Sequence, residues 1–364
     1  MSSASSTSLF QPSHGASLFS IVALAAVTLA GGASTLVTFF AVAVLAIAVM
    51  TSVHHAEVIA LRIGPSLGAL VLALSVTVIE VGLIVSMMTN DTPDSSIVAR
   101  DTVFSAVIIV TNGIMGVCLL LGGLRHKELG FHAGGSNSLL SVLAVLSGLT
   151  LVLPSFTTST AGGTFNAPQL VFASGASLLL YGCLVFSQTR SHRDYFEPAP
   201  AVGEEREEHA RPSRNAALVS FVCLLLSLGA VIGFAKTLSP SIEAGITAVG
   251  APRATVGIVI ALLVLLPETW AAISAARVNQ LQTSLNLALG SGAASIALTI
   301  PVVSAFALAT DRPLTLGLDA KNIAFLTITF VTSGLTLGRG STTALQGLIH
   351  LVLLLAFLAF AFAP

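Results

Sequence analysis

Long apolar stretches alternate with short polar ones along the whole chain. A membrane-spanning helix needs about 20 consecutive and mostly apolar residues, and eleven stretches approach that length. The pattern therefore predicts an all-α polytopic membrane protein with eleven transmembrane helices. We expect them at about 16–31, 33–52, 66–89, 100–124, 136–154, 168–189, 215–238, 251–276, 282–309, 319–338 and 343–362.

The composition agrees with that of a membrane protein and gives no sign of a nucleic-acid-binding or disulfide-rich protein. The chain has 364 residues, of which 54% are hydrophobic and 9% charged, whereas soluble domains carry about 25% charged residues. A formal net charge of −1 gives no reason to expect a nucleic-acid partner. Cys118, Cys183 and Cys223 all lie in apolar runs, so we expect no disulfide framework.

Two glutamates interrupt otherwise apolar spans. Glu80 lies within 68–88, and Glu268 lies within 257–274. A carboxylate inside a bilayer is costly, so it normally faces a protein interior or a water-filled cavity and marks an ion or proton route. The alternative is a structural role, as a neutral hydrogen-bonded acid or in an ion pair. Neither span contains a Lys or Arg that could serve as the partner.

The two glutamates belong to an internal repeat. A shift of 188 positions lays Glu80 and its apolar upstream segment over Glu268, and a shift of 186 lays Glu57 over Glu243. Apolar matches are common between membrane segments, but matching glutamates are not. The repeat therefore predicts that each half contributes one buried carboxylate and one flanking carboxylate.

The next span of each half carries a third landmark. Asn112 and Asn286 are both followed four residues later by a glycine. Five spans per half would insert the second half upside down, an arrangement typical of secondary transporters with a site near the midplane. The predicted parts are an N-terminal tail with an extra helix (1–32), two inverted five-helix repeats (33–190 and 215–364), and a charged loop (191–214). The loop is either a solvated linker or a cation-sensing regulatory segment.

Oxygen-rich side chains accompany the glutamates. Thr77 lies on the same helical face as Glu80, Asn286 brings an amide oxygen, and Pro267 is expected to kink the helix just before Glu268. Carboxylate, amide and backbone oxygens suit a hard cation such as Ca²⁺. Without a cation, two neighbouring buried carboxylates cannot both stay charged. They therefore take up protons. A site that holds either cation or protons and opens to each side in turn is an antiporter.

Other polar residues suggest gates or sensors. Glu57 and Glu243 are candidate gates or proton relays, although exposed helix-end glutamates are the plainer alternative. His54 and His55 are either a pH sensor or an interfacial pair without a function. The segment that contains them does not have the spacing of a zinc-hydrolase motif.

Lys and Arg predict the orientation. With eleven spans, ten Lys and Arg side chains fall on one side and five on the other, and half of the ten are Arg190 and the four arginines of the charged loop. Cytoplasmic loops carry the excess of positive residues. We therefore expect a bacterial inner-membrane protein with a cytoplasmic N-terminus and loop and an external C-terminus.

Three long motifs carry a resemblance to a known family. They are HHAEVIALRIGPSLGALVLALSVTVIEVGLIVSMM in the first half, and IEAGITAVGAPRATVGIVIALLVLLPE and NQLQTSLNLALGSGAASIALTIPV in the second. From about Val53 onward the chain resembles the CAX-like cation/proton exchangers of the calcium:cation antiporter superfamily, most closely the bacterial ChaA-type calcium and sodium/potassium–proton antiporters. The resemblance implies eleven helices, an acidic loop between inverted repeats, and cation binding by Glu80 and Glu268.

The chain departs from that family in one respect. Calcium/proton exchangers of the superfamily usually have Gly-Asn-x-x-Glu in both repeats, whereas here Val76-Thr77 precede Glu80 and Val264-Leu265 precede Glu268. Fewer oxygens make Na⁺ or K⁺ more plausible substrates beside Ca²⁺. We therefore expect export of Ca²⁺, Na⁺ and K⁺ against protons, in lipid and without a cofactor. The alternatives are a cation channel and a proton-coupled transporter of another small solute; no motif of an intramembrane enzyme is found.

Overall fold

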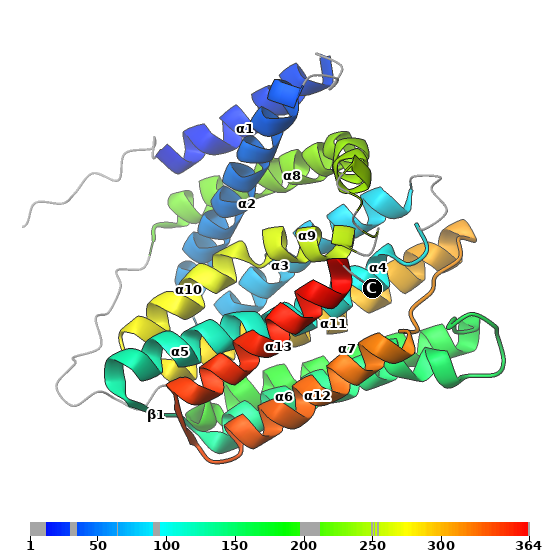
Figure 1. The fold of residues 1–364 in the computed structure, drawn as a ribbon. Coiled ribbons are helices and arrows are strands. Elements are labelled where there is room, and N and C mark those ends of the chain that lie inside the picture. The colour runs from blue at the N-terminus through cyan, green and yellow to red at the C-terminus, as the bar shows by residue number, and fades with distance from the viewer. Residues whose placement is uncertain are drawn as a thin grey trace, which may run out of the picture. The chain divides into compact units, whose positions relative to one another are not determined.

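The computed structural model describes residues 12–29, 35–63, 65–89, 95–196, 212–248, 250, 252 and 255–362. Helices make up nearly all of it (Figure 1). The chain divides into two compact units, each drawn from both halves of the sequence. The first unit is Met1–Ser86 with Glu205–Ser241, and the second is Met87–Glu204 with Ile242–Pro364.

The first unit is built from α1 (Pro12–Leu29), α2 (Thr35–Ile63), most of α3 (Pro65–Met88) and most of α8 (Arg214–Ala248). Helix α1 packs on α2. It also contacts α8, because the hydroxyl of Ser227 donates to that of Ser17 at 3.0 Å and both side chains are buried. Helix α3 meets α8 where Gly82 faces the side chain of Ile232.

The second unit holds the remaining elements. Three of its helices change pitch along their length, and two very short strands pair with each other. The elements are α4 (Val98–Ile108), η1 (Ile109–Ile114), α5 (Met115–His126), β1 (Glu128–Gly130), α6 (Ala133–Ser147), η2 (Gly148–Val152), η3 (Leu153–Phe156), α7 (Ala167–Phe186), η4 (Ser187–Ser191), η5 (Arg193–Tyr195), α9 (Thr255–Val264), α10 (Leu266–Arg277), α11 (Leu281–Thr310), α12 (Ala320–Leu337), β2 (Ser341–Thr343) and α13 (Ala344–Phe362).

Eight helices among the described residues are long and apolar enough to cross a membrane, or nine if α9 and α10 form one bent span. Two further apolar helices are shorter, at Ser13–Leu29 and Ser75–Met88. The all-α membrane architecture is thus confirmed. The count of eleven spans stays a prediction.

The loops of the second unit gather at two opposite ends. At one end, β1 pairs antiparallel with β2 and Glu128 lies opposite Thr343. At the other, Thr164 bridges to Thr315 and the N–H of Gly317 donates to the carbonyl of Gly163 at 2.8 Å.

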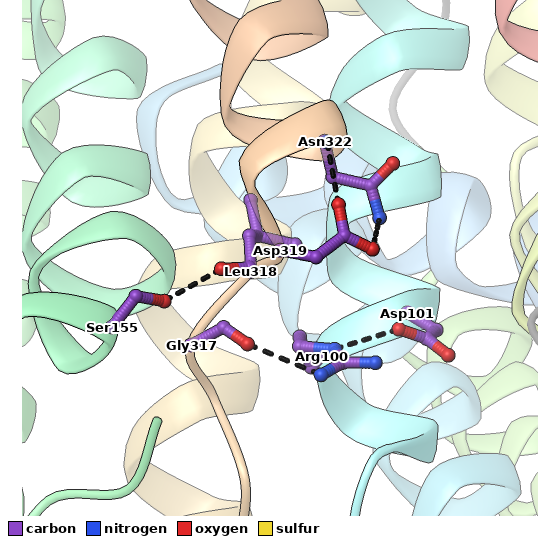
Figure 2. Close-up of polar contacts among 7 residues, drawn as sticks. All are labelled: Arg100, Asp101, Ser155, Gly317, Leu318, Asp319 and Asn322. Atoms are coloured by element: carbon purple, nitrogen blue, oxygen red, sulfur yellow. Dashed lines mark hydrogen bonds and ion pairs between the residues drawn. The ribbon is translucent and has the colours of Figure 1, made fainter. Parts of the chain in front are cut away.

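Figure 2 shows the polar contacts of that second end. Arg100 forms an ion pair with Asp101 at 2.8 Å and donates to the carbonyl of Gly317 at 3.1 Å. The hydroxyl of Ser155 donates to the carbonyl of Leu318 at 2.7 Å. Arg100 therefore links the start of α4 to the segment just before α12.

Candidate cation-binding site

Glu268 lies at a break in a helix. The axes of Thr255–Val264 and Glu268–Arg277 differ by 59°, and Pro267 precedes the glutamate in the first turn of α10. Proline has no N–H to donate to the carbonyl of Leu263 and its ring clashes there, so the predicted kink is confirmed. The half-buried Glu268 sits where the N–H groups of a helix start favour a negative charge.

Glu80 lies in a helix without such a break. Glu80 is 3% exposed, and Thr77, one turn earlier, is 6% exposed. Helix α3 runs unbroken from Pro65 to Met88. The predicted line of a hydroxyl and a carboxylate on one buried face of α3 is therefore present. Glu80 belongs to the first unit and Glu268 to the second.

Asn112 occupies the centre of a fully buried polar cluster in the second unit. It lies in η1, a π-helical turn between α4 and α5. Its amide nitrogen donates to the hydroxyl of Thr329 at 2.8 Å, and its amide oxygen is 3.0 Å from Nδ1 of His350. Nε2 of His350 is 3.1 Å from the hydroxyl of Thr336. Three helical segments, η1, α12 and α13, thus meet through polar side chains in an apolar interior.

The protonation of His350 follows from its two neighbours. The amide oxygen of Asn112 can only accept a hydrogen bond, so Nδ1 of His350 carries a proton. A neutral ring then presents Nε2 as an acceptor for the hydroxyl of Thr336. All four side chains are at most 6% exposed, and buried polar groups require such partners.

His350, Thr329 and Thr336 are not among the site residues predicted from the sequence. The signal for His350 was available, because it is an isolated ionisable residue inside the apolar stretch 343–362. The same rule that selected Glu80 and Glu268 selects it. Thr329 and Thr336 carry no comparable signal, since threonine is common in membrane helices and returns its hydrogen bond to its own backbone.

Two glycines let α13 approach the π-helical turn. Helices α5 and α13 lie side by side (Figure 1). A Cβ on Gly116 would lie 3.1 Å from Cβ of His350, and one on Gly347 would lie 2.8 Å from the carbonyl oxygen of Gly116. Small residues allow helix backbones in membranes to pack this closely. Gly116, the glycine of the repeat landmark, therefore brings His350 within reach of Asn112.

Asn286 has a different environment. It lies in the second turn of α11, half-buried, and its amide nitrogen donates to the backbone carbonyl of Phe196. Its amide oxygen accepts from Nε2 of Gln282 at 2.9 Å, and Oε1 of Gln282 accepts from the N–H of His132 at 2.7 Å. Asn286 thus links the segment around Phe196 to α11, and Gln282 links α11 to His132, just before α6.

That segment packs tightly on its neighbours. The ring of Tyr195 stacks on His132 with centroids 4.3 Å apart, and Phe196 is 8% exposed. A Cβ on Gly135 would lie 2.9 Å from the carbonyl carbon of Tyr195. The first residues of the charged loop are therefore docked on the second unit, while 197–211 lie outside the described residues.

The candidate gates and sensors lie in α2 and α8. His55 is fully buried, and its ring stacks on His14 with centroids 5.5 Å apart. His54 and Glu57 are exposed on α2. Glu243 belongs to α8, but its side chain lies outside the described residues. Over the part of the chain that is described, no group of three or more His, Cys, Asp or Glu side chains could hold a metal ion.

Comparison with known families decides the class of the protein. The sodium/calcium exchanger protein family matches the sequence twice, over 33–190 and 219–363. The chain belongs to this family. The resemblance to CAX-like exchangers is confirmed, and so is the prediction of a transporter rather than an enzyme, since the family consists of exchangers.

Individual relatives and structures support the assignment. The y4hA protein of Sinorhizobium fredii is 45% identical over 317 residues, covering 87% of this chain and 86% of its own. The sodium-potassium/proton antiporter ChaA of Escherichia coli is 33% identical over 353 residues, covering 95% of both chains. The solved structure of the Ca²⁺/H⁺ antiporter YfkE shares the fold, with a TM-score of 0.72 at 14% identity over 97% of this chain and 100% of that one.

Proposed function

We propose that this protein is a secondary active antiporter that exports Ca²⁺, Na⁺ and K⁺ in exchange for protons. The observation that carries the proposal is the double match to the exchanger family, because the matched halves contain the two repeat-related glutamates, Glu80 and Glu268. The choice of ions rests on the relatives, since ChaA is named for sodium, potassium and protons and YfkE for calcium and protons.

In the proposed mechanism Glu80 and Glu268 share one site. With both carboxylates charged and no cation bound, like-charge repulsion and desolvation favour proton uptake. A cation that enters supplies the compensating charge and displaces the protons. Alternating access of this one site to the two sides of the membrane then exchanges cation for protons.

The surroundings of the glutamates supply further oxygens. Pro267 has no N–H to donate to the carbonyl of Leu263, and a carbonyl without its helical partner is tolerated at membrane depth where it lines a cavity. Thr77, Asn112 and Asn286 are the proposed side-chain ligands. Glu57, Glu243, His54 and His55 are proposed as gates or proton relays at the ends of the route.

The proposed topology has eleven spans in two inverted repeats. Adding α1 and α3 to the nine spans counted above gives eleven, and the two family matches nearly coincide with the predicted halves. Lys127 and Arg339 belong to the ten side chains on the predicted cytoplasmic side, and Arg100 belongs to the five on the other side. In the second unit, Lys127 and Arg339 lie next to the end formed by β1 and β2, whereas Arg100 lies at the opposite end. This supports a cytoplasmic N-terminus and an external C-terminus. A C-terminal alkaline phosphatase fusion should be active, and a C-terminal green fluorescent protein should stay dark.

Transport in everted membrane vesicles tests the function. With a proton gradient established, Ca²⁺, Na⁺ and K⁺ are added separately and the gradient is followed by fluorescence quenching. We expect each cation to dissipate the gradient, and Glu80→Gln or Glu268→Gln to abolish the response. Glu128→Gln is the matched control, because Glu128 is an exposed glutamate in β1.

Two outcomes would contradict the proposal. A wild-type protein that leaves the gradient intact with all three cations is not a cation/proton antiporter. Cation flux that proceeds at the same rate with and without a proton gradient, and moves no protons, would instead identify a channel.

A further inference from the structure

We propose that His350 is a positioning residue for cation exchange, which fixes the amide of Asn112 in the orientation that binds the transported cation. The inference rests on the proposed function, because it takes Asn112 as a ligand. Neither the repeat nor the family match assigns a role to α13, yet α13 supplies the side chain in contact with the Asn112 oxygen.

The contacts support one orientation of the Asn112 amide. Nδ1–H of His350 donates to its oxygen at 3.0 Å, and its nitrogen donates to Thr329 at 2.8 Å. A flipped amide would require His350 to carry its proton on Nε2 instead, and the hydroxyls of Thr329 and Thr336 to exchange their donor and acceptor roles. The amide oxygen keeps a second lone pair, which can coordinate a cation.

The π-helical turn makes such a positioning residue necessary. A π turn widens the helix and weakens its local hydrogen bonding, and such turns occur frequently at functional sites. Asn112 lies within this turn, and α10, which begins beside Glu268, packs against η1. A ligand on this turn needs a hydrogen-bond partner on a neighbouring helix to fix its orientation. Metal ligands are generally oriented in this way by the groups that hydrogen-bond to them.

His350 is in turn held from its far side. The hydroxyl of Thr336 lies 3.1 Å from Nε2 of His350. The Cβ of His350 packs against Gly116, which limits the position of the atom that carries the ring. Both ring nitrogens of His350 therefore have a partner in this orientation. Its effect on transport passes through Asn112 alone.

Three substitutions at His350 separate positioning from packing. Asn retains an N–H group at the place of Nδ1 and can still donate to Asn112. Gln places its amide near the place of Nε2 and can reach only Thr336. Leu removes both interactions while keeping an apolar side chain of moderate size.

The readouts are the half-saturating cation concentration, the maximal exchange rate and the melting temperature in detergent. We expect His350→Leu and His350→Gln to raise the half-saturating concentration about tenfold, the effect of losing one buried hydrogen bond. The maximal rate should change less than threefold, and His350→Asn should restore the wild-type affinity to within about threefold. Thr336→Val, which leaves the Asn112 contact in place, is the matched control and should change affinity less than His350→Gln does.

A double-mutant cycle completes the test. If His350 acts through Asn112, His350→Leu should leave the affinity of an Asn112→Ala protein unchanged. Equal affinities for His350→Asn and His350→Gln, or changes that follow only the melting temperature, would overturn the positioning role. Failure of the wild-type protein to exchange cations would instead reject the proposed function. If His350→Leu does not fold, the comparison of Asn, Gln and Thr336→Val still decides.

Discussion

Asn112 and Asn286 occupy equivalent places in the sequence repeat but different places in the structure. Asn112 is fully buried, and its amide is hydrogen-bonded to side chains from α12 and α13. Asn286 is half-buried and contacts a neighbour on its own helix and the backbone of a docked loop. Two residues of the same type at equivalent positions of an internal repeat can therefore have different partners, because different helices surround them.

The glycines that follow these asparagines differ in the same way. Gly116 lies against α13, where a Cβ would lie 3.2 Å from Cγ of Leu351. Around Gly290, by contrast, no described atom outside its local helix backbone lies within 4 Å of such a Cβ. The first glycine allows a close helix crossing, whereas the second has space for a side chain. Both halves of the sequence thus have the same Asn–Gly spacing, but the two glycines differ in how they pack against other helices.

The largest expected effect comes from filling the close helix crossing. Gly347→Ala would place a Cβ 2.7 Å from Cα of Leu120, so the backbones of α5 and α13 must separate. We expect the free energy of unfolding to fall by about 2 to 3 kcal/mol. Gly290→Ala should instead raise it by about 0.5 to 1 kcal/mol, since alanine is the better helix former. Unfolding titrations in mixed detergent measure both, and equal destabilisation would remove the contrast between the two glycines.

The two asparagines should differ next in cation affinity. Asn112→Ala leaves Nδ1 of the buried His350 and the hydroxyl of Thr329 without the amide they contact, so we expect a loss of about 1 to 3 kcal/mol of stability and an affinity at least tenfold weaker. Asn286→Ala frees groups near the end of a helix that water can reach, and should weaken affinity by about threefold or less. Vesicle exchange at varied cation concentration measures both. A larger effect at Asn286 would place the main amide ligand in the second half.

A smaller effect is expected at the other partner of the Asn112 amide. Thr329→Val keeps the shape of the side chain but removes the acceptor for the amide nitrogen of Asn112. We expect a loss of about 1 kcal/mol in stability and a weaker effect on affinity than at His350, because the oxygen contact remains. An affinity loss greater than that of His350→Gln would transfer the positioning role to α12.

The smallest expected effect is local to the docked loop. Asn286→Ala removes the donor to the carbonyl of Phe196, so amide hydrogen exchange at 192–196 should become faster while global stability changes by less than about 1 kcal/mol. Asn112→Ala is the control and should leave exchange in this segment unchanged. Unaltered protection in Asn286→Ala would mean that the stacking of Tyr195 on His132 holds the segment without help.

The sequence was sufficient for features that depend on local chemistry. Apolar runs predict spanning helices because the bilayer requires about 20 such residues. Pro267 predicts the bend before Glu268 because a proline lacks the N–H and clashes one turn back. Glu80, Glu268 and Asn112 stand out because polar groups are rare inside apolar runs. None of these inferences needs to know which helix lies next to which.

The tertiary structure alone decided what surrounds those residues. His350 and Asn112 are 238 positions apart, and they meet because Gly116 and Gly347 let α5 and α13 come close. Phe196 and Asn286 meet because the start of the charged loop folds back onto α11. The hydrophobic free energy is roughly proportional to the apolar area removed from water and does not depend on direction. It therefore favours the insertion of apolar helices into a membrane but does not determine which helices become neighbours. The choice of neighbours comes from surface shape, which small residues create only when both helices are in place.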